Sequence, residues 1–365
     1  MSAWIVAARR TAVVPRGGAF ARLSIEALGA PVVRAVLAEA GVEAVDELVV
    51  SNALGAGGNP ARRVALAAGL PVAGLTIDRQ CAGGLDALRL AAALVESGAE
   101  AVMAGGVESY SRRPLRLATD PDGGAPVPYD EAPFTPWPDR DPGMAEAAAA
   151  LAERLGIGRA AQEAYAVESH RKALAAGPAG IVELAGVGRD AFPRRLTPGV
   201  AARAKGVAGS ITAATMAVAA DGAAFCLVVG ERMAARFPRA LRIVDSATLG
   251  SDPMEPGLSA IAPMRAVLER AGIGAGELER VELMEAFAVQ AMATVTALGL
   301  DMGRVNPEGG GLAFGHPVGA SGAMLAVRLF HGLSRGYGLA GIAGAGGVGA
   351  ALLVQARDRT EPGRI

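Results

Sequence analysis

The spacing of apolar residues alternates between two periods along the first hundred residues. Residues 4–8 and Glu47–Ser51 are short apolar runs of the kind found in buried strands. Residues 23–40 have helical spacing, and Gly41 stands where such a helix would end. Residues 59–69 predict a shorter helix. This alternation of strands and helices predicts an α/β fold built of layers.

The pattern changes between residues 111 and 143. Eight of the 22 prolines fall in this stretch, interleaved with aspartates, which predicts a long excursion over the surface. Helical spacing returns at 144–155 and 160–176, before a second segment, 190–209, that is poor in apolar residues. We therefore expect an insertion within a layered core. The predicted units are an N-terminal half, 1–112 continued by 220–240, an insertion, 113–219, and a C-terminal half, 241–365.

Two distant segments repeat the same order of elements. Residues 78–106 contain a glycine-rich loop with Cys81, an apolar helix, and a strand predicted over 101–104. Residues 315–347 contain a glycine-rich loop with His316, a helix predicted over 323–333, and another strand. The repeat indicates an internal duplication in which each half contributes one reactive side chain from an equivalent loop.

The composition narrows the class of protein. The chain has 365 residues, which allows about two or three domains, with 52% hydrophobic and 19% charged residues. The formal charge of −1 gives no electrostatic reason to expect nucleic acid or an anionic membrane as partner. Two cysteines cannot form a disulfide framework, and three histidines leave little for a metal site. We expect a cytoplasmic protein, without signal peptide or membrane helix, because the first apolar run is short and the stretch 338–354 is interrupted by glycines.

Cys81 is the best candidate for a nucleophile. The predicted helix places it at or before the first turn, where free backbone N–H groups and the helix dipole favour a thiolate. Residues 82–84 are Ala-Gly-Gly, so a bulky acyl group could approach the sulfur. The alternative is a small buried hydrophobic residue, as most free cysteines are. Cys226, within an apolar strand pattern, is assigned to that second class.

His316 is the best candidate for an acid or base. Its loop is Gly-His-Pro-Val-Gly-Ala-Ser-Gly, and a histidine there could hold Cys81 as thiolate, act as general base or donate to an oxyanion. The alternative is a turn histidine bonded to its own backbone. We predict that His170 lies on a solvated helix face and that His331 is a core histidine. The run 344–349 formally matches a dinucleotide fingerprint, but two strands meeting in a tight turn explain it better.

A series of short motifs occurs in a fixed order. They are Arg10-Thr-Ala, Asn59-Pro-Ala-Arg, Gln80-Cys-Ala-Gly-Gly-Leu, Ala104-Gly-Gly-Val-Glu-Ser, Ala152-Glu-Arg-Leu-Gly-Ile, Asp221-Gly-Ala-Ala, Glu285-Ala-Phe-Ala and Gly315-His-Pro-Val-Gly-Ala-Ser-Gly. In this order the chain resembles the thiolase family, the acyl-CoA C-acyltransferases, over nearly its whole length. The resemblance implies a duplicated five-layer α-β-α-β-α core with a loop insertion that carries most contacts to CoA and the acyl chain.

The resemblance also implies roles for individual residues. Cys81 would be the acylated nucleophile, His316 its activator, and the backbone N–H groups of Cys81 and Ala345 the oxyanion hole. Substrate contacts are expected at Met144, Ala213, Ala217, Ala286 and Phe287. The partners implied are acyl-CoA, as substrate, and further copies of the chain in a homodimer or homotetramer. No cofactor or metal is expected beside the coenzyme A thioester.

Three positions depart from the family pattern. Ala343 stands where the family has a second cysteine, the acid/base that removes the α-proton of the acceptor. Met284 replaces an asparagine that orders a water for the enolate. Ala217 replaces a serine that reaches the pantetheine. The sequence therefore predicts acylation of Cys81 and a weakened capacity for the second, carbon–carbon bond-forming step.

Two functions follow. The first is a thiolase-type acyltransferase that forms or cleaves a carbon–carbon bond of 3-ketoacyl-CoA, or transfers the acyl group to another acceptor. A hydroxyl, an amine, an activated aromatic carbon or water would need no α-deprotonation. The second is a non-catalytic acyl-CoA-binding or partner subunit with the same fold. The intact surroundings of Cys81 and His316 favour the acyltransferase.

Overall fold

The N-terminal half builds one side of a mixed sheet. The computed structural model describes residues 2–55, 57–178 and 180–357. The strand order is β4-β3-β5-β11-β1, in which β3 is parallel to β4 and β5, and β11 is antiparallel to β5 and β1. The bounds are β1 (Ala3–Thr11), β2 (Val14–Pro15), β3 (Glu47–Ser51), β4 (Leu75–Ile77), β5 (Ala101–Ser109), β8 (Ile181–Val182) and β11 (Ala220–Gly230).

The C-terminal half continues the sheet in the order β12-β15-β14-β13. The halves join where Trp4 and Ile5 of β1 pair with Arg242 and Leu241 of β12. The pair β14–β15 confirms the prediction that two strands meet in a tight turn at residues 344–349. The bounds are β12 (Leu241–Gly250), β13 (Leu278–Leu283), β14 (Tyr337–Gly344) and β15 (Val348–Ala356).

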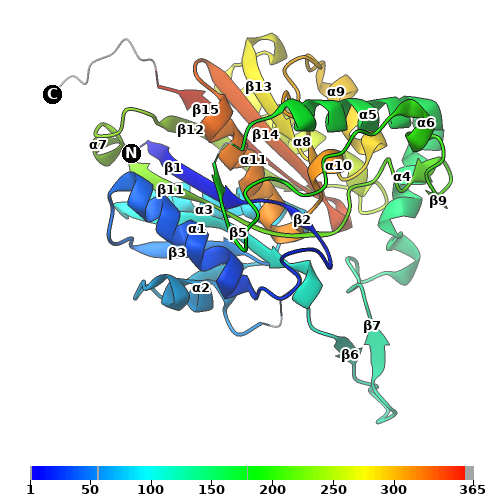
Figure 1. Ribbon diagram of the computed structural model, residues 1–365, viewed down its shortest axis with the longest axis horizontal. Coiled ribbons are helices and arrows are strands. Elements are labelled where there is room, and N and C mark those ends of the chain that lie inside the picture. Colours follow the sequence, from blue (N-terminus) through cyan, green and yellow to red (C-terminus); the bar gives the residue numbers. More distant parts are fainter. Residues whose placement is uncertain (1, 56, 179, 358–365) are drawn as a thin grey trace.

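Helices complete five layers around the two parts of the sheet (Figure 1). Helices α3 and α11 pack against each other and lie between the two parts, with contacts to β5 and β11 on one side and β14 and β15 on the other. Outer helices α1 and α2 cover the N-terminal strands, and α8 and α9 cover the C-terminal strands. The bounds are α1 (Ile25–Ala40), α2 (Pro60–Ala68), α3 (Gly83–Glu96), α8 (Ile261–Ala271), α9 (Ala288–Leu298) and α11 (Val318–Gly332). The expected α-β-α-β-α arrangement is confirmed.

Helix α1 illustrates how local sequence sets these elements. The side chain of Ser24 accepts a hydrogen bond from the N–H of Ala27 at the start of the helix. Gly41 ends it with φ 61°, a left-handed conformation that glycine adopts without steric cost. Apolar residues at helical spacing, including Leu28, Val32 and Val36, are fully buried against the sheet. The predicted helix over 23–40 is therefore confirmed to within two residues.

The two central helices approach so closely that their backbones touch. A side chain at Gly84 of α3 would collide with the backbone nitrogen of Ala323, and one at Gly322 of α11 would lie 2.5 Å from the nitrogen of Leu85. Only glycine permits this approach. As a consequence, the loops that precede α3 and α11, which carry Cys81 and His316, lie side by side.

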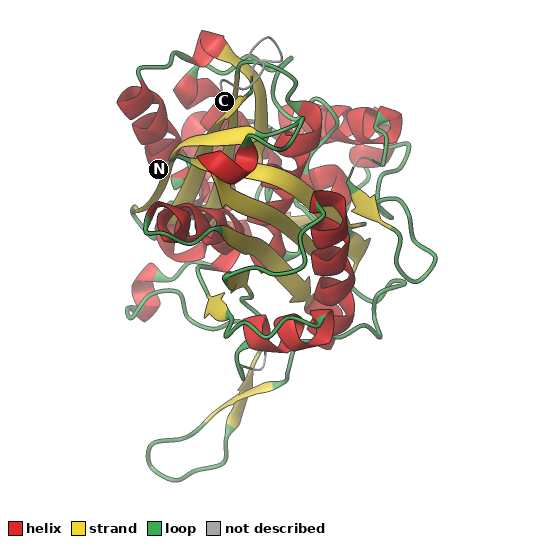
Figure 2. Cartoon of the chain, turned by 90° about the vertical axis from the view of Figure 1, so that its left-hand side faces the viewer, coloured by secondary structure: helices red, strands yellow, loops and turns green. Residues whose placement is uncertain are grey.

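Residues 113–219 lie outside these layers for most of their length. Residues 113–143 cross the surface as predicted, with an additional hairpin that projects away from the body of the molecule (Figure 2). Helix α4 packs on α9, and α5 packs on α6, α9 and α10. The bounds in this segment are β6 (Arg116–Ala118), β7 (Val127–Tyr129), α4 (Met144–Leu155), α5 (Arg159–Ala175), α6 (Pro198–Ala201), β9 (Gly206–Ala208) and β10 (Ile211–Thr212). Two further short helices lie outside it, α7 (Glu231–Ala234) and α10 (Gly311–Phe314).

Two predicted boundaries are wrong for the same physical reason. Strand β5 does not end at its glycines but continues to Ser109, because Gly105 and Gly106 let β11 and the start of α11 approach the strand. Helix α11 begins at Val318 rather than at residue 323, because the small residues of its first turn pack against α3. In both places glycine indicates close packing rather than an end of structure.

Candidate active site

The two reactive residues identified from the sequence meet in space. Nε2 of His316 lies 3.0 Å from Sγ of Cys81. Cys81 lies in a short 3-10 turn, Gln80–Ala82, directly before α3, and His316 lies two residues before α11. Each side chain is thus presented by the loop at the start of a buried helix.

The imidazole of His316 is held from both sides of the ring. Nδ1 lies 2.6 Å from Oγ of Ser321, one turn into α11. The backbone is fixed by a hydrogen bond from the N–H of His316 to the carbonyl of Val218. The neutral tautomer that accepts from a thiol at Nε2 carries its proton on Nδ1 and donates it to Ser321.

Burial determines the charge state of the pair. Desolvation raises the pKa of the Cys81 thiol to about 12, although hydrogen bonds from backbone N–H groups lower this pKa to a smaller extent. Desolvation also lowers the pKa of His316 to about 4. The expectation that the helix start lowers the pKa of Cys81 is therefore wrong, because the cost of burying a thiolate exceeds the stabilisation by the helix terminus. At neutral pH the unliganded pair is a neutral thiol hydrogen-bonded to a neutral imidazole.

Two backbone N–H groups point toward the sulfur. They belong to Ala345 and to Cys81 itself, and both lower the pKa of the thiol. Ala345 starts the tight turn between β14 and β15, where Gly346 and Gly347 adopt φ values of 70° and 76°. These are the two groups for which the sequence suggests an oxyanion hole, and the structure places both beside the nucleophile.

A cavity of about 510 Å³ opens at the Cys81–His316 pair. Four of the five residues expected to contact substrate line this cavity: Met144, Ala217, Ala286 and Phe287. The fifth, Ala213, is exposed and lies outside its lining. The loops that carry these residues are joined by a bridge between Met216 and Phe287 and by a hydrogen bond from the N–H of Ala217 to the carbonyl of Ala286.

Two of the three positions that depart from the family pattern, Ala343 and Met284, have different surroundings. Ala343, near the end of β14, lines the cavity and presents only a methyl group there. Met284 is 3% exposed, packs in the central core near Gly311 and does not line the cavity. The second cysteine of the chain, Cys226, is fully buried in β11, as predicted, so it cannot replace a side chain at Ala343.

The other histidines have structural surroundings. The prediction of a solvated face for His170 is wrong: it is 1% exposed, its Nδ1 accepts from the N–H of Arg194, and Phe192 packs on the ring. The prediction that His331 lies in the core is wrong in part, because the residue is only half-buried, but its Nε2 is hydrogen-bonded to the carbonyl of Ala8, 2.7 Å away. Within residues 2–55, 57–178 and 180–357, no group of three or more histidine, cysteine or acidic side chains is arranged to hold a metal ion.

Comparison with known families decides the relationship. The family described as "Thiolase, N-terminal domain" matches residues 3–190, and "Thiolase, C-terminal domain" matches residues 238–356. The chain belongs to the thiolase family.

Full-length relatives support this assignment. A Bacillus subtilis protein named "Putative acetyl-CoA C-acetyltransferase YhfS" is 37% identical, over 97% of this chain and 99% of the relative. Proteins named "Acetyl-CoA acetyltransferase" from Pseudomonas aeruginosa and Cupriavidus necator are each 36% identical. Those alignments cover 97% and 96% of this chain, and 99% and 98% of the relatives. The thiolase relationship thus extends over both halves and the segment between them.

One buried acid of this thiolase-family chain was not identified from the sequence. Glu108, at the end of β5, is 1% exposed and accepts hydrogen bonds from Nδ2 of Asn52 and from the N–H groups of Ala53, Leu54 and Gly319. It therefore ties the wall of the cavity after β3 to the first turn of α11. A signal was present, because an acidic residue in an otherwise apolar buried strand needs a specific set of partners.

None of the helices within residues 2–55, 57–178 and 180–357 has both the length and the apolar character that a bilayer crossing requires.

Proposed function

We propose that this thiolase-family chain transfers an acyl group from an acyl-CoA thioester through a covalent acyl-Cys81 intermediate. The observation that carries the proposal is the 3.0 Å contact between Sγ of Cys81 and Nε2 of His316 at the cavity. A thiol and a neutral base at hydrogen-bond distance, with the base oriented by a third group, is the arrangement that nucleophilic acyl transfer requires.

The first half-reaction follows from this geometry. As Sγ of Cys81 attacks the thioester carbonyl, its proton passes to Nε2 of His316. Negative charge develops on the carbonyl oxygen, which the N–H groups of Cys81 and Ala345 would stabilise. The tetrahedral intermediate then breaks its bond to the sulfur of CoA, and His316 returns the proton to that sulfur. The products are an acyl thioester on Cys81 and free CoA, with no net change in protons.

The cavity suits such a substrate. Its inner lining contains apolar groups, among them Met144, Ala217 and Phe287, which we assign to the acyl and pantetheine portions. Arg113, which precedes the β6–β7 hairpin, and Arg116, its first residue, also line the cavity and are suited to the phosphates of CoA. We place Ala213 outside the substrate contacts. The reaction needs no cofactor or metal in addition to the coenzyme A thioester.

The second half-reaction is where this chain departs from the family. Condensation requires removal of an α-proton from the acceptor, and Ala343 offers no group that can accept it. Loss of one acid/base group typically costs ~10²–10⁴-fold in rate. We therefore propose weak condensation and thiolysis, with transfer of the acyl group to an acceptor that needs no α-deprotonation, such as a hydroxyl, an amine, an activated aromatic carbon or water.

The alternative function is a non-catalytic acyl-CoA-binding or partner subunit. The replacement at Ala343 favours this alternative, because it removes a group needed for the complete family reaction. A single-turnover experiment separates the two functions: an acyltransferase releases one equivalent of CoA per chain from acetyl-CoA and gains the acyl mass. A binding subunit retains intact acetyl-CoA and its own mass.

Assembly and location complete the proposal. We propose a homodimer or homotetramer, supported by apolar side chains exposed on the projecting hairpin, among them Leu117 and Val127 at 59% and 63% exposure. Light scattering at micromolar concentration tests this, and a monomer would contradict it. Cys81 and Cys226 are both free thiols, as is usual in a reducing compartment, and on this ground we place the protein in the cytoplasm.

A further inference from the structure

A second cavity lies beside the C-terminal part of α11. Its volume is about 250 Å³, and it shares no lining residue with the cavity at Cys81. Its walls come from β1, the end of α5, the segments 176–178 and 181–193, and α11. Five of its lining residues carry formal charges: Arg10, Arg189, Asp190, Glu308 and Arg328.

Arg10 lines this cavity with a guanidinium whose donors are not all used. It is 4% exposed, and its two terminal nitrogens bind both carboxylate oxygens of Asp190 at 2.7 and 2.9 Å. Its Nε is buried and has no hydrogen-bond partner among the described residues. Asp190 is fully used, because its Oδ1 also accepts from the N–H of Val13. A buried N–H of a charged guanidinium without acceptor is unusual and indicates a missing partner.

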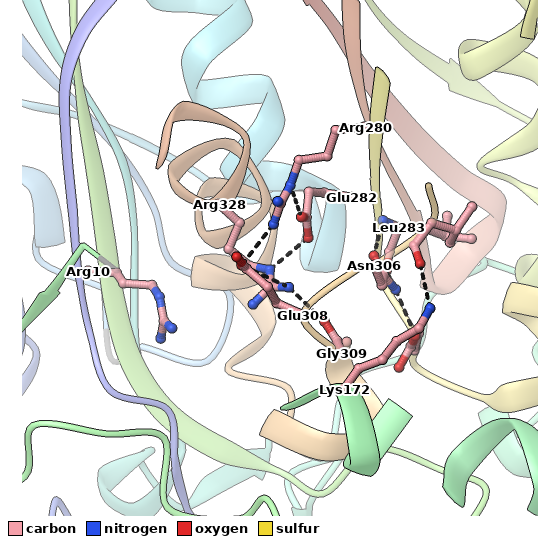
Figure 3. Close-up of polar contacts among 12 residues, drawn as sticks. Arg10, Lys172, Arg280, Glu282, Leu283, Asn306, Glu308, Gly309 and Arg328 are labelled. Carbon is pink, nitrogen blue, oxygen red and sulfur yellow. Dashed lines mark hydrogen bonds and ion pairs between the residues drawn. The ribbon is translucent and has the colours of Figure 1, made fainter. Parts of the chain in front are cut away.

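The opposite wall is an ion-pair network (Figure 3). The carboxylates of Glu282 and Glu308 lie between the guanidinium groups of Arg280 and Arg328, while Arg10 extends from β1 on the other side. Glu282 accepts from Nε of both arginines at 2.7 Å, and Glu308 accepts from Arg280 at 2.8 Å. The hydrogen bonds of Arg328 use Nε and Nη2, the latter to the carbonyl of Gly309.

The charges of this region do not balance. The lining residues and their direct partners comprise four arginines and three carboxylates. Despite burial, Arg10 lowers the pKa of Asp190, and Arg280, Arg328 and Arg10 lower the pKa of Glu308. Arg189, exposed at the rim, makes no hydrogen bond or ion pair with the described residues. The cavity therefore has a positive potential that its own carboxylates do not neutralise.

We propose that this cavity binds a small oxyanion of about the size of phosphate, held by Arg10, Arg189 and Arg328. The guanidinium groups of Arg10 and Arg328 line the cavity and are almost fully buried, and the exposed side chain of Arg189 stands at its rim. Guanidinium groups are the side chains best suited to planar and tetrahedral oxyanions. A volume of about 250 Å³ accommodates such an anion with several waters, each of which occupies ~30 Å³ in the liquid. The site is independent of the proposed acyl transfer.

Isothermal titration of the full chain with inorganic phosphate tests this site. The buffer contains only chloride as anion, and ionic strength is held constant. We expect saturable binding of phosphate that Arg189→Gln weakens at least tenfold. Arg232→Gln is the matched control: its side chain is 93% exposed on α7, near the Ala3 end of β1 and away from Arg10, and it should bind phosphate as the wild type does. Arg10→Gln should abolish binding if the variant folds; Arg189→Gln carries the test if it does not.

Parallel titrations with sulfate and acetate identify the ligand chemistry. Tighter binding of phosphate or sulfate assigns the site to a tetrahedral oxyanion, and tighter binding of acetate assigns it to a carboxylate; either supports an oxyanion site. Absence of saturable binding by the wild type to all three anions would overturn the proposal. Equal binding by wild type and Arg189→Gln would also overturn it, because the bound anion would then lie elsewhere, for example at Arg113 and Arg116.

Discussion

Sγ of Cys81 and Nε2 of His316 are 3.0 Å apart although 235 positions separate the two residues in sequence. The approach depends on α3 and α11, whose backbones touch at Gly84 and Gly322. Each helix brings the loop before its first turn to the same point between the two parts of the sheet. The internal duplication thus builds an active site from one residue of each half.

The pH dependence of thiol alkylation tests the charge state of the pair. Because the pKa of Cys81 is raised to about 12, the thiolate is a minor species throughout the neutral range, and its fraction rises with pH. We expect the rate of iodoacetamide labelling at Cys81 to increase about tenfold per pH unit between pH 7 and 9, since only the thiolate reacts. A plateau with a midpoint below pH 8 would mean that a thiolate–imidazolium pair exists in the free protein.

Cys226 is the internal control for this labelling. It is fully buried in β11, whereas Cys81 lines an open cavity. Labelling of Cys81 should therefore exceed that of Cys226 at every pH in the folded protein, and acetyl-CoA should protect Cys81 alone. Peptide mapping after limited labelling measures both rates in one sample.

Removal of the groups behind the nucleophile should slow acylation in a graded manner. His316→Ala removes the base and is expected to lower the single-turnover acylation rate ~10²–10⁴-fold. Ser321→Ala leaves the base but removes its 2.6 Å partner, and we expect a loss of ~10-fold, corresponding to about 1.4 kcal/mol. His331→Gln is the control, because His331 lies outside the substrate cavity. Equal rates in Ser321→Ala and wild type would show that Ser321 does not orient the imidazole.

The titration of Glu108 should make the free energy of unfolding depend on pH. Burial raises its pKa from 4.5 to about 7, although the hydrogen bonds from the N–H groups of Ala53, Gly319 and Leu54 act in the opposite direction and lower it. The folded state therefore holds this proton more tightly than the unfolded chain. Its contribution to the free energy of unfolding falls as pH rises from about 4.5 to about 7, with a limiting slope of about 1.4 kcal/mol per pH unit, and is constant above that range.

Activity should follow the opposite direction, because only the carboxylate accepts all of these hydrogen bonds. We expect the acylation rate to rise with pH through about 7 in the wild type. Glu108→Gln should remove the pH dependence of stability between about 4.5 and 7 and lower the acylation rate at pH 8. Urea unfolding and single-turnover acylation over this range measure both. An unchanged acidic limb in Glu108→Gln would assign the titration to another group.

Much of this arrangement can be predicted from the sequence because it depends on local signals. The ends of α1, α2 and α4 carry capping residues such as Ser24 and Asn59 or closing glycines, and the positions predicted for these helices agree with the structure. The loop positions of Cys81 and His316 likewise follow from glycine-rich motifs next to apolar helices. Their contact follows only from the family resemblance and the duplication.

What the sequence does not predict depends on tertiary surroundings. The pKa of Cys81 is raised because both halves bury it, a cost that no local pattern reports. His170 has polar neighbours in sequence, yet the segment with Phe192 and Arg194 folds over it. The role of Glu108 depends on hydrogen-bond partners that are distant in sequence, among them Gly319, 211 positions away. The role of Ser321 depends on the direction in which the His316 imidazole points.

Restoring the missing base tests the account of the second half-reaction. Ala343 lines the cavity, so Ala343→Cys should place a thiol beside the acceptor and raise the rate of acetoacetyl-CoA thiolysis or condensation above that of the wild type. Met284→Asn, added to it, restores the family asparagine and should raise the rate further. Its gain is limited because Met284 is 3% exposed, and an unsatisfied amide there costs ~1–3 kcal/mol of stability.

Coupled steady-state assays of acetoacetyl-CoA cleavage measure these variants, with thermal unfolding as the control for stability. Wild-type turnover at rates common for enzymes, ~1–10³ s⁻¹, would show that another residue carries the proton. In that case Ala343→Cys should bring no gain.

The central claim is that Cys81 accepts an acyl group with the help of His316. The most direct test incubates the protein with acetyl-CoA, measures the intact mass, and maps the modified peptide after proteolysis at acidic pH. The account predicts one added acetyl group, on the peptide that contains Cys81, in the wild type and in Cys226→Ser. The modification should be absent in Cys81→Ser and strongly delayed in His316→Ala. An unmodified wild-type protein after prolonged incubation with acetyl-CoA and longer acyl-CoAs, or an acetyl group on any residue other than Cys81, would contradict it.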